Sequence, residues 1–122
     1  MFSESTISGK HMICDIKGIK NMDLLHNLDK MKEVLDFICI NHDFSVLEKV
    51  EHKFHPEGVS ILYLLSESHL SIHTFPERSY IAFDLYTCRT YEDNTVYLQI
   101  YDYLISAFDA IKETPTIIDR NF

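Results

Sequence analysis

The segment Val59–Cys88, VSILYLLSESHLSIHTFPERSYIAFDLYTC, decides the fold of this 122-residue chain. Its apolar run Val59–Leu65 predicts a strand, and the polar stretch Ser66–Ser71 predicts a tight turn. A short strand is expected over Ile72–Phe75 and, after a proline turn, a further strand over Tyr80–Cys88. Strands in such close succession predict hairpins, and therefore antiparallel pairing.

Outward from this segment, strand-like and helix-like patterns follow one another. A strand is expected over about residues 10–15, stopped by Gly18, and Thr116–Ile118 predicts an edge strand. Two stripes of apolar residues at three- and four-residue steps predict helices that begin near Asn21 and near Asp93-Asn94. The first stripe is Leu24, Leu25, Leu28, Met31, Leu35 and Ile38, and the second is Val96, Tyr97, Ile100, Leu104, Ile105, Phe108 and Ile111.

The region before Val59 completes the expected architecture. Residues Phe44, Val46, Val50 and Phe54 alternate with polar neighbours, as in a half-buried strand, and residues 55–58 have the composition of a turn. This order of elements predicts an α+β fold, a two-layer α/β sandwich with a mostly antiparallel sheet and two main helices. A chain of this length supports one core, so we expect a single domain.

Composition excludes several classes of function. Eleven basic against nineteen acidic residues give a net charge of −8, which disfavours nucleic acid and anionic membrane surfaces. No apolar run approaches the roughly 20 residues of a membrane helix. The N-terminal MFSESTISGK lacks the basic start and apolar core of a signal peptide, so a cytoplasmic location is expected. Cys14, Cys39 and Cys88 are an odd number without CxxC spacing, which argues against a disulfide framework or a structural zinc site.

Reactive side chains are unusually dense in the second half of the opening segment. Ser68 is a candidate nucleophile, and His73, five residues further on, could supply its base across a turn. A lone histidine is more often a polar residue on the exposed face of a strand. His69, His73 and Glu77 also resemble a zinc ligand set, but four residues of strand span about 13 Å, which disfavours a metal.

The runs Glu67–Glu77, ESHLSIHTFPE, and Asp84–Cys88, DLYTC, together resemble the prokaryotic S-adenosylmethionine decarboxylase proenzymes. A match of this length and spacing is far more specific than a short motif. The resemblance implies a pyruvoyl-dependent carboxy-lyase that supplies the aminopropyl donor for spermidine and other polyamines. It covers most of the chain and includes Gly9-Lys10-His11, Asp15, Phe54, Pro56, Gly58 and Ser60.

The resemblance also implies how the cofactor is made. In such proenzymes the serine matching Ser68 attacks the carbonyl of the residue matching Glu67, and elimination of the resulting ester leaves a pyruvoyl group at the new N-terminus. One domain, residues 1–122, is then expected to cut itself into a β chain of residues 1–67 and an α chain of residues 68–122. His73 matches the base for the elimination, and Ser60 matches a hydrogen-bonding partner at the scissile region. No metal is implied.

Further roles implied by the resemblance concern the substrate. The pyruvoyl ketone forms a Schiff base with the substrate amine and accepts the electrons left when CO₂ departs. Cys88 matches the proton donor, a role that suits a thiol with an ordinary pKa of about 8.5. Phe54 matches an aromatic beside the adenine, and Glu77 matches the position that holds the ribose hydroxyls. A homodimer is also implied, with two sheets packed face to face in a four-layer αββα body and the sites near its interface.

Five positions depart from the pattern of the family: Ile61 and Arg89 stand where Gly is usual, Phe75 where Trp is usual, and Arg78-Ser79 where a Gly-containing pair is common. An added cation beside Cys88 could change the charge and shape of the pocket, unless Arg89 points away. Two alternatives therefore stay open: a decarboxylase of the same family that acts on ornithine or arginine, or an unprocessed homologue with a binding or regulatory role.

Overall fold

One antiparallel sheet of six strands forms the body of the protein, as seen in a computed structural model that describes residues 6–122. Residues 1–5, part of the stretch behind the signal-peptide prediction, lie outside the described residues. The strand order is β2-β3-β4-β5-β1-β6, and every neighbouring pair is antiparallel. The strands are β1 (Ile7–Ile16), β2 (Val46–Lys53), β3 (Val59–Leu65), β4 (Ser68–Phe75), β5 (Tyr80–Thr87) and β6 (Thr116–Asn121).

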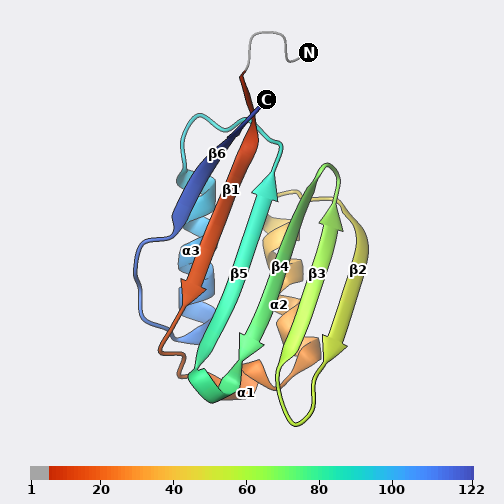
Figure 1. Cartoon of the computed structure of the whole chain (residues 1–122), viewed down its shortest axis with the longest axis vertical. Coiled ribbons are helices and arrows are strands. Elements are labelled where there is room, and N and C mark those ends of the chain that lie inside the picture. The colour runs from red at the N-terminus through yellow and green to blue at the C-terminus, as the bar shows by residue number, and fades with distance from the viewer. Residues whose placement is uncertain (1–5) are drawn as a thin grey trace.

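The helices cover a single face of this sheet (Figure 1). They are α1 (Met22–Leu25), α2 (Leu28–Asn41) and α3 (Thr95–Phe108), and a short 3₁₀ turn, η1 (Pro76–Arg78), connects β4 to β5. Within residues 6–122 no helix is long and apolar enough to cross a membrane. The predicted two-layer α+β fold, with a largely antiparallel sheet and two main helices, is confirmed.

The core lies between the helices and the face of the sheet that they cover. Alternate residues of each central strand point into it, because side chains of a strand alternate between its two faces. The helices contribute the apolar stripes predicted from the sequence. Fully buried side chains from the sheet include Ile61, Tyr63, Leu65, Leu70, Ile72, Ile81, Phe83 and Leu85, and those from α2 and α3 include Met31, Leu35, Ile100, Leu104 and Phe108.

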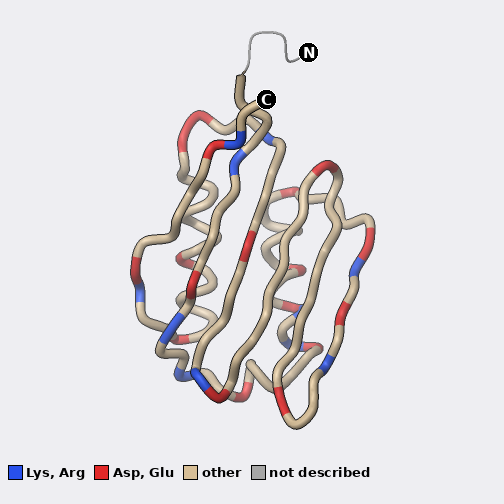
Figure 2. Tube along the Cα trace, viewed as in Figure 1, with Lys and Arg blue, Asp and Glu red and all other residues tan. Residues whose placement is uncertain are grey.

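The opposite face of the sheet, which we call the open face, has no covering layer among the described residues. Its strands β3 and β4 carry no Asp, Glu, Lys or Arg (Figure 2), and large apolar side chains are exposed on it beside the polar His69, Ser71 and His73. An apolar surface of this kind normally meets a partner. The predicted face-to-face homodimer would cover it and stays a prediction. Large apolar residues exposed on this face are Val50, Phe54, Leu62, Leu64, Phe75 and Ile118.

The prediction of a polar turn over Ser66–Ser71 followed by a short strand is wrong. The loop holds only Ser66 and Glu67, and β4 begins at Ser68. The polar residues that suggested a turn are the outward half of a strand: His69 and Ser71 lie on the open face, while Leu70 is buried in the core. A strand that exposes one face alternates polar and apolar residues. The serines made this alternation look like the composition of a turn.

The single long helix predicted from Asn21 is also wrong, because two helices meet at His26 and Asn27. Asn27 caps α2 with its side chain, which accepts a hydrogen bond from Lys30 N at 3.0 Å. Asn21 makes no side-chain cap and instead donates to the carbonyl of Ala107. An unbroken apolar stripe can therefore run across two helices, since α1 and α2 pack on the same core.

Two further expectations are corrected at the edges of the elements. Ile111 lies beyond α3, where its side chain occupies the space beside Gly18, whose φ is +62° and whose added Cβ would meet it at 2.5 Å. The half-buried strand expected around Phe44–Phe54 is an edge strand with Val50 and Phe54 exposed on the open face.

Candidate active site

The β3–β4 hairpin holds the bond between Glu67 and Ser68 in a tight loop. Leu65 pairs directly with Ser68, so the loop contains only two residues. The second of them, Glu67, has a φ of +61°, in the left-handed region. That conformation costs a residue with a side chain about 1–2 kcal/mol. The bond that the sequence marks for cleavage therefore directly follows a strained residue.

Three side chains meet at this loop, and we call Glu67, Ser68 and Cys88 the junction cluster. Ser68 is only 5% exposed, and its Oγ accepts a hydrogen bond from the backbone N–H of Cys88 at 3.3 Å. The Cys88 thiol donates to Glu67 Oε2 at 3.3 Å. These contacts join residues 20 and 21 positions apart in the sequence, because β4 and β5 are neighbouring strands.

The junction cluster favours a protonated thiol. Burial raises the pKa of Cys88, and the hydrogen bond to the Glu67 carboxylate raises it further. A charged carboxylate beside sulfur disfavours the thiolate, which would place two negative charges together. Cys88 therefore carries its proton at neutral pH, the state that a proton donor needs.

A second group of candidate residues, which we call the pocket cluster, consists of Phe54, Ser60, His73 and Glu77. Ser60 and His73 face each other across β3 and β4, and Ser60 Oγ shares a hydrogen bond of 2.7 Å with His73 Nδ1. All four residues line one pocket of about 270 Å³ on the open face. The pocket also contains Phe75, which sequence reasoning noted only as a departure from the family.

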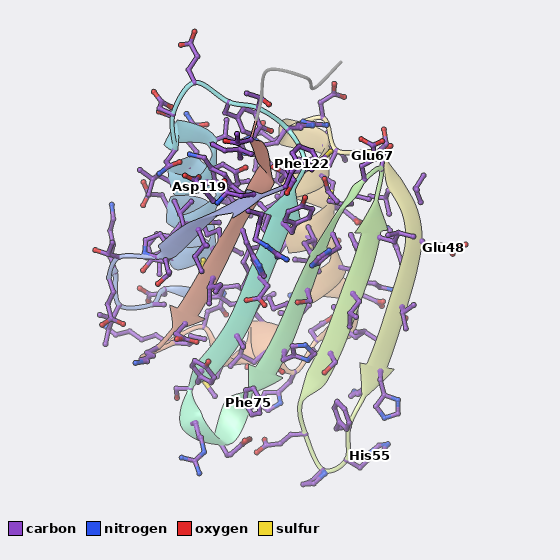
Figure 3. All side chains as sticks on the ribbon, turned by 45° about the horizontal axis from the view of Figure 1, so that its top comes forward. Glu48, His55, Glu67, Phe75, Asp119 and Phe122 are labelled. Atoms are coloured by element: carbon purple, nitrogen blue, oxygen red, sulfur yellow. The ribbon has the colours of Figure 1, made fainter. Side chains whose placement is uncertain are left out.

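The two clusters lie at opposite ends of the sheet. Figure 3 shows Glu67 at one end of β4 and Phe75 at the other. Ser68 and His73 are five residues apart on β4, which places them about 17 Å apart and on opposite faces. The expectation that His73 reaches Ser68 across a turn is wrong within one chain, since no turn separates them.

The two unusual residues of the pocket region both point elsewhere. Arg89 turns toward the end of α2, where its Nη1 donates to the carbonyl of His42 at 2.7 Å and its Nη2 to that of Asp43. Its guanidinium also lies 4.5 Å from the centre of the Phe44 ring. Ile61 is fully buried in the core, on the face opposite Ser60. Neither substitution places a new group among the candidate site residues.

Two residues of the N-terminal motif lie on the open face as well. His11 Nε2 is 3.6 Å from Asp84 Oδ2, and Asp15 accepts a hydrogen bond of 2.5 Å from the Tyr80 hydroxyl. Among residues 6–122, no three His, Cys, Asp or Glu side chains converge closely enough to hold a metal ion. His69 and His73, weighed as zinc ligands, are four residues apart on one strand.

The sequence could not reveal what the Glu67 carboxylate contacts. Cleavage chemistry drew attention only to its backbone carbonyl, and Cys88 lies 21 positions further along the chain. Only the register of β3, β4 and β5 brings the two together. The only sequence feature that pointed to a role for this side chain was its position directly before the candidate nucleophile, Ser68.

Fold and site together define a class of small α+β proteins with a serine, a thiol and a strained bond at the end of a central hairpin. A sequence profile described as S-adenosylmethionine decarboxylase matches residues 10–121. The chain therefore belongs to the S-adenosylmethionine decarboxylase family, and its relatives are bacterial proenzymes. This confirms the resemblance found in the motifs after Glu67.

Individual relatives agree with this family. The S-adenosylmethionine decarboxylase proenzyme of Clostridium botulinum (strain Loch Maree / Type A3) is 37% identical over 107 residues, which cover 87% of this chain and 91% of the relative. Proenzyme 2 of Bacillus cereus (strain ZK / E33L) is 41% identical over 104 residues, covering 84% and 80%. The crystal structure of the adenosylmethionine decarboxylase from Aquifex aeolicus VF5 superposes with a TM-score of 0.82 at 24% identity, covering 97% and 94%. That likeness shows the shared fold.

Proposed function

We propose that this protein is a self-processing, pyruvoyl-dependent decarboxylase that converts S-adenosylmethionine into an aminopropyl donor for polyamine synthesis. The observation that carries the proposal is the junction cluster, in which a strained Glu67 precedes a buried serine and a protonated thiol. Membership of the decarboxylase family supports the same reaction class. Residues 1–67 would become the β chain and residues 68–122 the α chain.

The cut begins with Ser68. Its Oγ attacks the carbonyl carbon of Glu67, a C–O bond forms, and the C–N bond breaks to give an ester with a free amine. A base then removes the Cα proton of Ser68. The bond between Cβ and Oγ of Ser68 breaks, which releases the Glu67 carboxylate. Water replaces the nitrogen, which leaves as ammonia, and a pyruvoyl group remains. The backbone strain at Glu67 favours the rearrangement of the Glu67–Ser68 amide into the ester.

The residues present fit this group. Ser68 would provide the carbon atoms of the pyruvoyl group, and Cys88 stands beside Ser68 with its proton on sulfur. Once formed, the group supplies an electron sink for the loss of CO₂ from an amine-bearing substrate. Cys88 then delivers its proton to the carbon that lost CO₂, a task that needs only a neutral thiol within reach.

The proposal places the processing base, His73, on a second copy of the chain. Since His73 lies about 17 Å from Ser68 along β4, it cannot act on Ser68 of its own chain. In a homodimer with two open faces packed against each other, a two-fold axis that runs across the strands would bring one end of each sheet to the opposite end of the other. Each site would then combine the junction cluster of one protomer with the pocket cluster of its partner.

The pocket cluster also bears on the choice of substrate. Phe54 offers an aromatic face and Glu77 a carboxylate, which could bind the adenine and ribose of a nucleoside but also the cationic side chain of ornithine or arginine. Arg89 turns away from the site, so it neither repels a cationic sulfonium nor binds a carboxylate there. Neither observation separates these substrates, and the preference for S-adenosylmethionine rests on membership of its decarboxylase family.

Decarboxylation assays test this proposal directly. Purified protein is incubated with S-adenosylmethionine, ornithine or arginine, and the released CO₂ is measured beside the intact mass of the chains. We expect two chains and CO₂ from S-adenosylmethionine. Activity on an amino acid alone would reject the substrate. One uncut chain of 14.3 kDa without any CO₂ would favour the binding or regulatory alternative.

A further inference from the structure

The Glu67 side chain has no role in the chemistry described so far, which uses only its carbonyl. Its carboxylate nevertheless turns toward the end of β5 and accepts the hydrogen bond of the Cys88 thiol at 3.3 Å. Because the loop has only two residues, Glu67 is held close to the first residue of β4. Its side chain therefore stands next to both reacting groups.

We propose that Glu67 is a positioning residue whose carboxylate holds the Cys88 thiol beside the Glu67–Ser68 junction. The proposal rests on the function proposed above, in which Cys88 donates a proton. Cys88 is then fixed at two points, since its backbone N–H bonds to Ser68 Oγ and its thiol bonds to Glu67. The two contacts together define where the proton on sulfur lies.

The same contact has an electrostatic consequence. A carboxylate beside a thiol disfavours the thiolate, so Glu67 keeps the proton on Cys88 until the substrate carbon takes it. Burial acts in the same direction and is the larger cause of the raised pKa. Removal of the Glu67 carboxylate should therefore lower the pKa of Cys88 toward its ordinary value but not all the way to it. After the proposed cut, the same side chain belongs to the new C-terminal residue of the β chain.

Thiol alkylation measures this contact without any need for cleavage. In a Ser68→Ala protein, the rate of Cys88 alkylation by iodoacetamide is followed against pH, with the site identified by peptide mass. Cys14 and Cys39 compete little, since burial raises their thiol pKa values to about 12 and about 11. Glu67→Gln should move the midpoint of the alkylation profile to lower pH and raise the alkylation rate near pH 7.5 about threefold or more.

Three matched variants complete the test. Glu67→Asn should behave like Glu67→Gln, and it guards against misfolding because Asn tolerates a positive φ. Glu67→Asp keeps the negative charge, so Cys88 should be alkylated nearly as slowly as in the parent Ser68→Ala protein. Glu48→Gln removes an exposed carboxylate from the edge strand and should leave the profile unchanged. High salt should narrow the difference between the parent Ser68→Ala protein and its Glu67→Gln variant, because salt screens exposed charges.

The outcomes separate this proposal from the function on which it rests. An unchanged alkylation profile in both Glu67→Gln and Glu67→Asn would overturn the positioning role, even if the wild-type chain cuts itself. A shifted profile with a wild-type chain that never cuts would instead reject the self-processing function. A shift reproduced by Glu48→Gln would assign it to net charge and would also overturn the positioning role.

Discussion

Ser79, in the pair Arg78-Ser79 where the family pattern commonly contains a glycine, shows at the scale of one residue what such a glycine would relieve. It follows η1 with a φ of +49°, in the left-handed region that costs a residue with a Cβ about 1–2 kcal/mol. Its hydroxyl makes only a long contact, 3.8 Å, with Met22 Sδ. The departure from the family at this position is therefore a local loss of stability, and it brings no new group to the site.

Replacement of Ser79 by glycine should stabilise the protein. We expect Ser79→Gly to raise the free energy of unfolding by about 0.5–1 kcal/mol, because relief of the strain exceeds the added flexibility of the unfolded chain. Urea unfolding measures the change. Ser79→Ala is the matched control, since it removes the hydroxyl but keeps the Cβ. Equal stability of the two variants would show that the hydroxyl, and not φ, matters.

His42 gives the protein a pH dependence at the same scale. Burial lowers the pKa of His42, and the nearby Arg89 lowers it further. The unfolded chain, with a histidine pKa of about 6.5, therefore binds a proton more readily than the folded chain. The stability linked to His42 is complete above this pH and is lost as pH falls through the lower pKa of the folded state.

A comparison of unfolding at two pH values isolates this effect. Between about pH 7.5 and about pH 5.5, the wild-type protein should lose more free energy of unfolding than His42→Asn, which has no proton to bind there. Chemical denaturation at each pH provides both values. His26→Asn serves as a control on a residue at the exposed end of α1. An identical loss in the wild type and His42→Asn would contradict the assignment.

At the scale of elements, the close contact between β1 and β5 depends on Gly9. A Cβ at this position would lie 2.0 Å from the carbonyl oxygen of Thr87, the residue before Cys88. Backbone atoms cannot rotate out of the way, so the strands would have to separate at the junction cluster. This contact gives a physical reason for the glycine in the N-terminal motif.

Gly9→Ala should therefore lower the free energy of unfolding by about 1–3 kcal/mol, as overpacking against rigid backbone does. It should also slow cleavage at Glu67–Ser68, because Cys88 N and Ser68 Oγ are hydrogen-bonded. Thermal unfolding and intact mass provide the two measurements. Lys20→Ala, an exposed change after the same strand, is the control. An unfolding free energy of Gly9→Ala equal to that of the wild type would mean that β1 and β5 can move apart at no cost.

The elements differ in how well the sequence predicted them. Val59–Leu65 and Tyr80–Thr87 were predictable. The first is a nearly continuous apolar run, and the second has an apolar side chain at every other position. The start of β4 was not, since Ser68, His69 and Ser71 carry turn-like polarity within a strand. Likewise the site residues could be named but not grouped: strand register decides that Glu67 meets Cys88 and that Ser60 meets His73.

At the scale of the whole molecule, the open face should be a contact between two copies. Leu62 lies there, 47% exposed, whereas Leu98 on α3 is 44% exposed on the helical side. We expect Leu62→Glu to give monomers in sedimentation and to block cleavage, because a buried unpaired charge opposes face-to-face packing. Leu98→Glu should remain a dimer and cut normally. Dimers in both variants would place the interface elsewhere.

The composite site leads to the most direct test of the account, since Ser68 and His73 should act from different chains. Co-expression of Ser68→Ala with His73→Ala places an intact Ser68 opposite an intact His73 in each mixed dimer, although neither variant should cut alone. Intact mass should then reveal residues 68–122 of the His73→Ala chain, recognised by the mass of its alanine. No cleavage in the mixed dimers, despite a wild-type chain that cuts itself, would contradict the account.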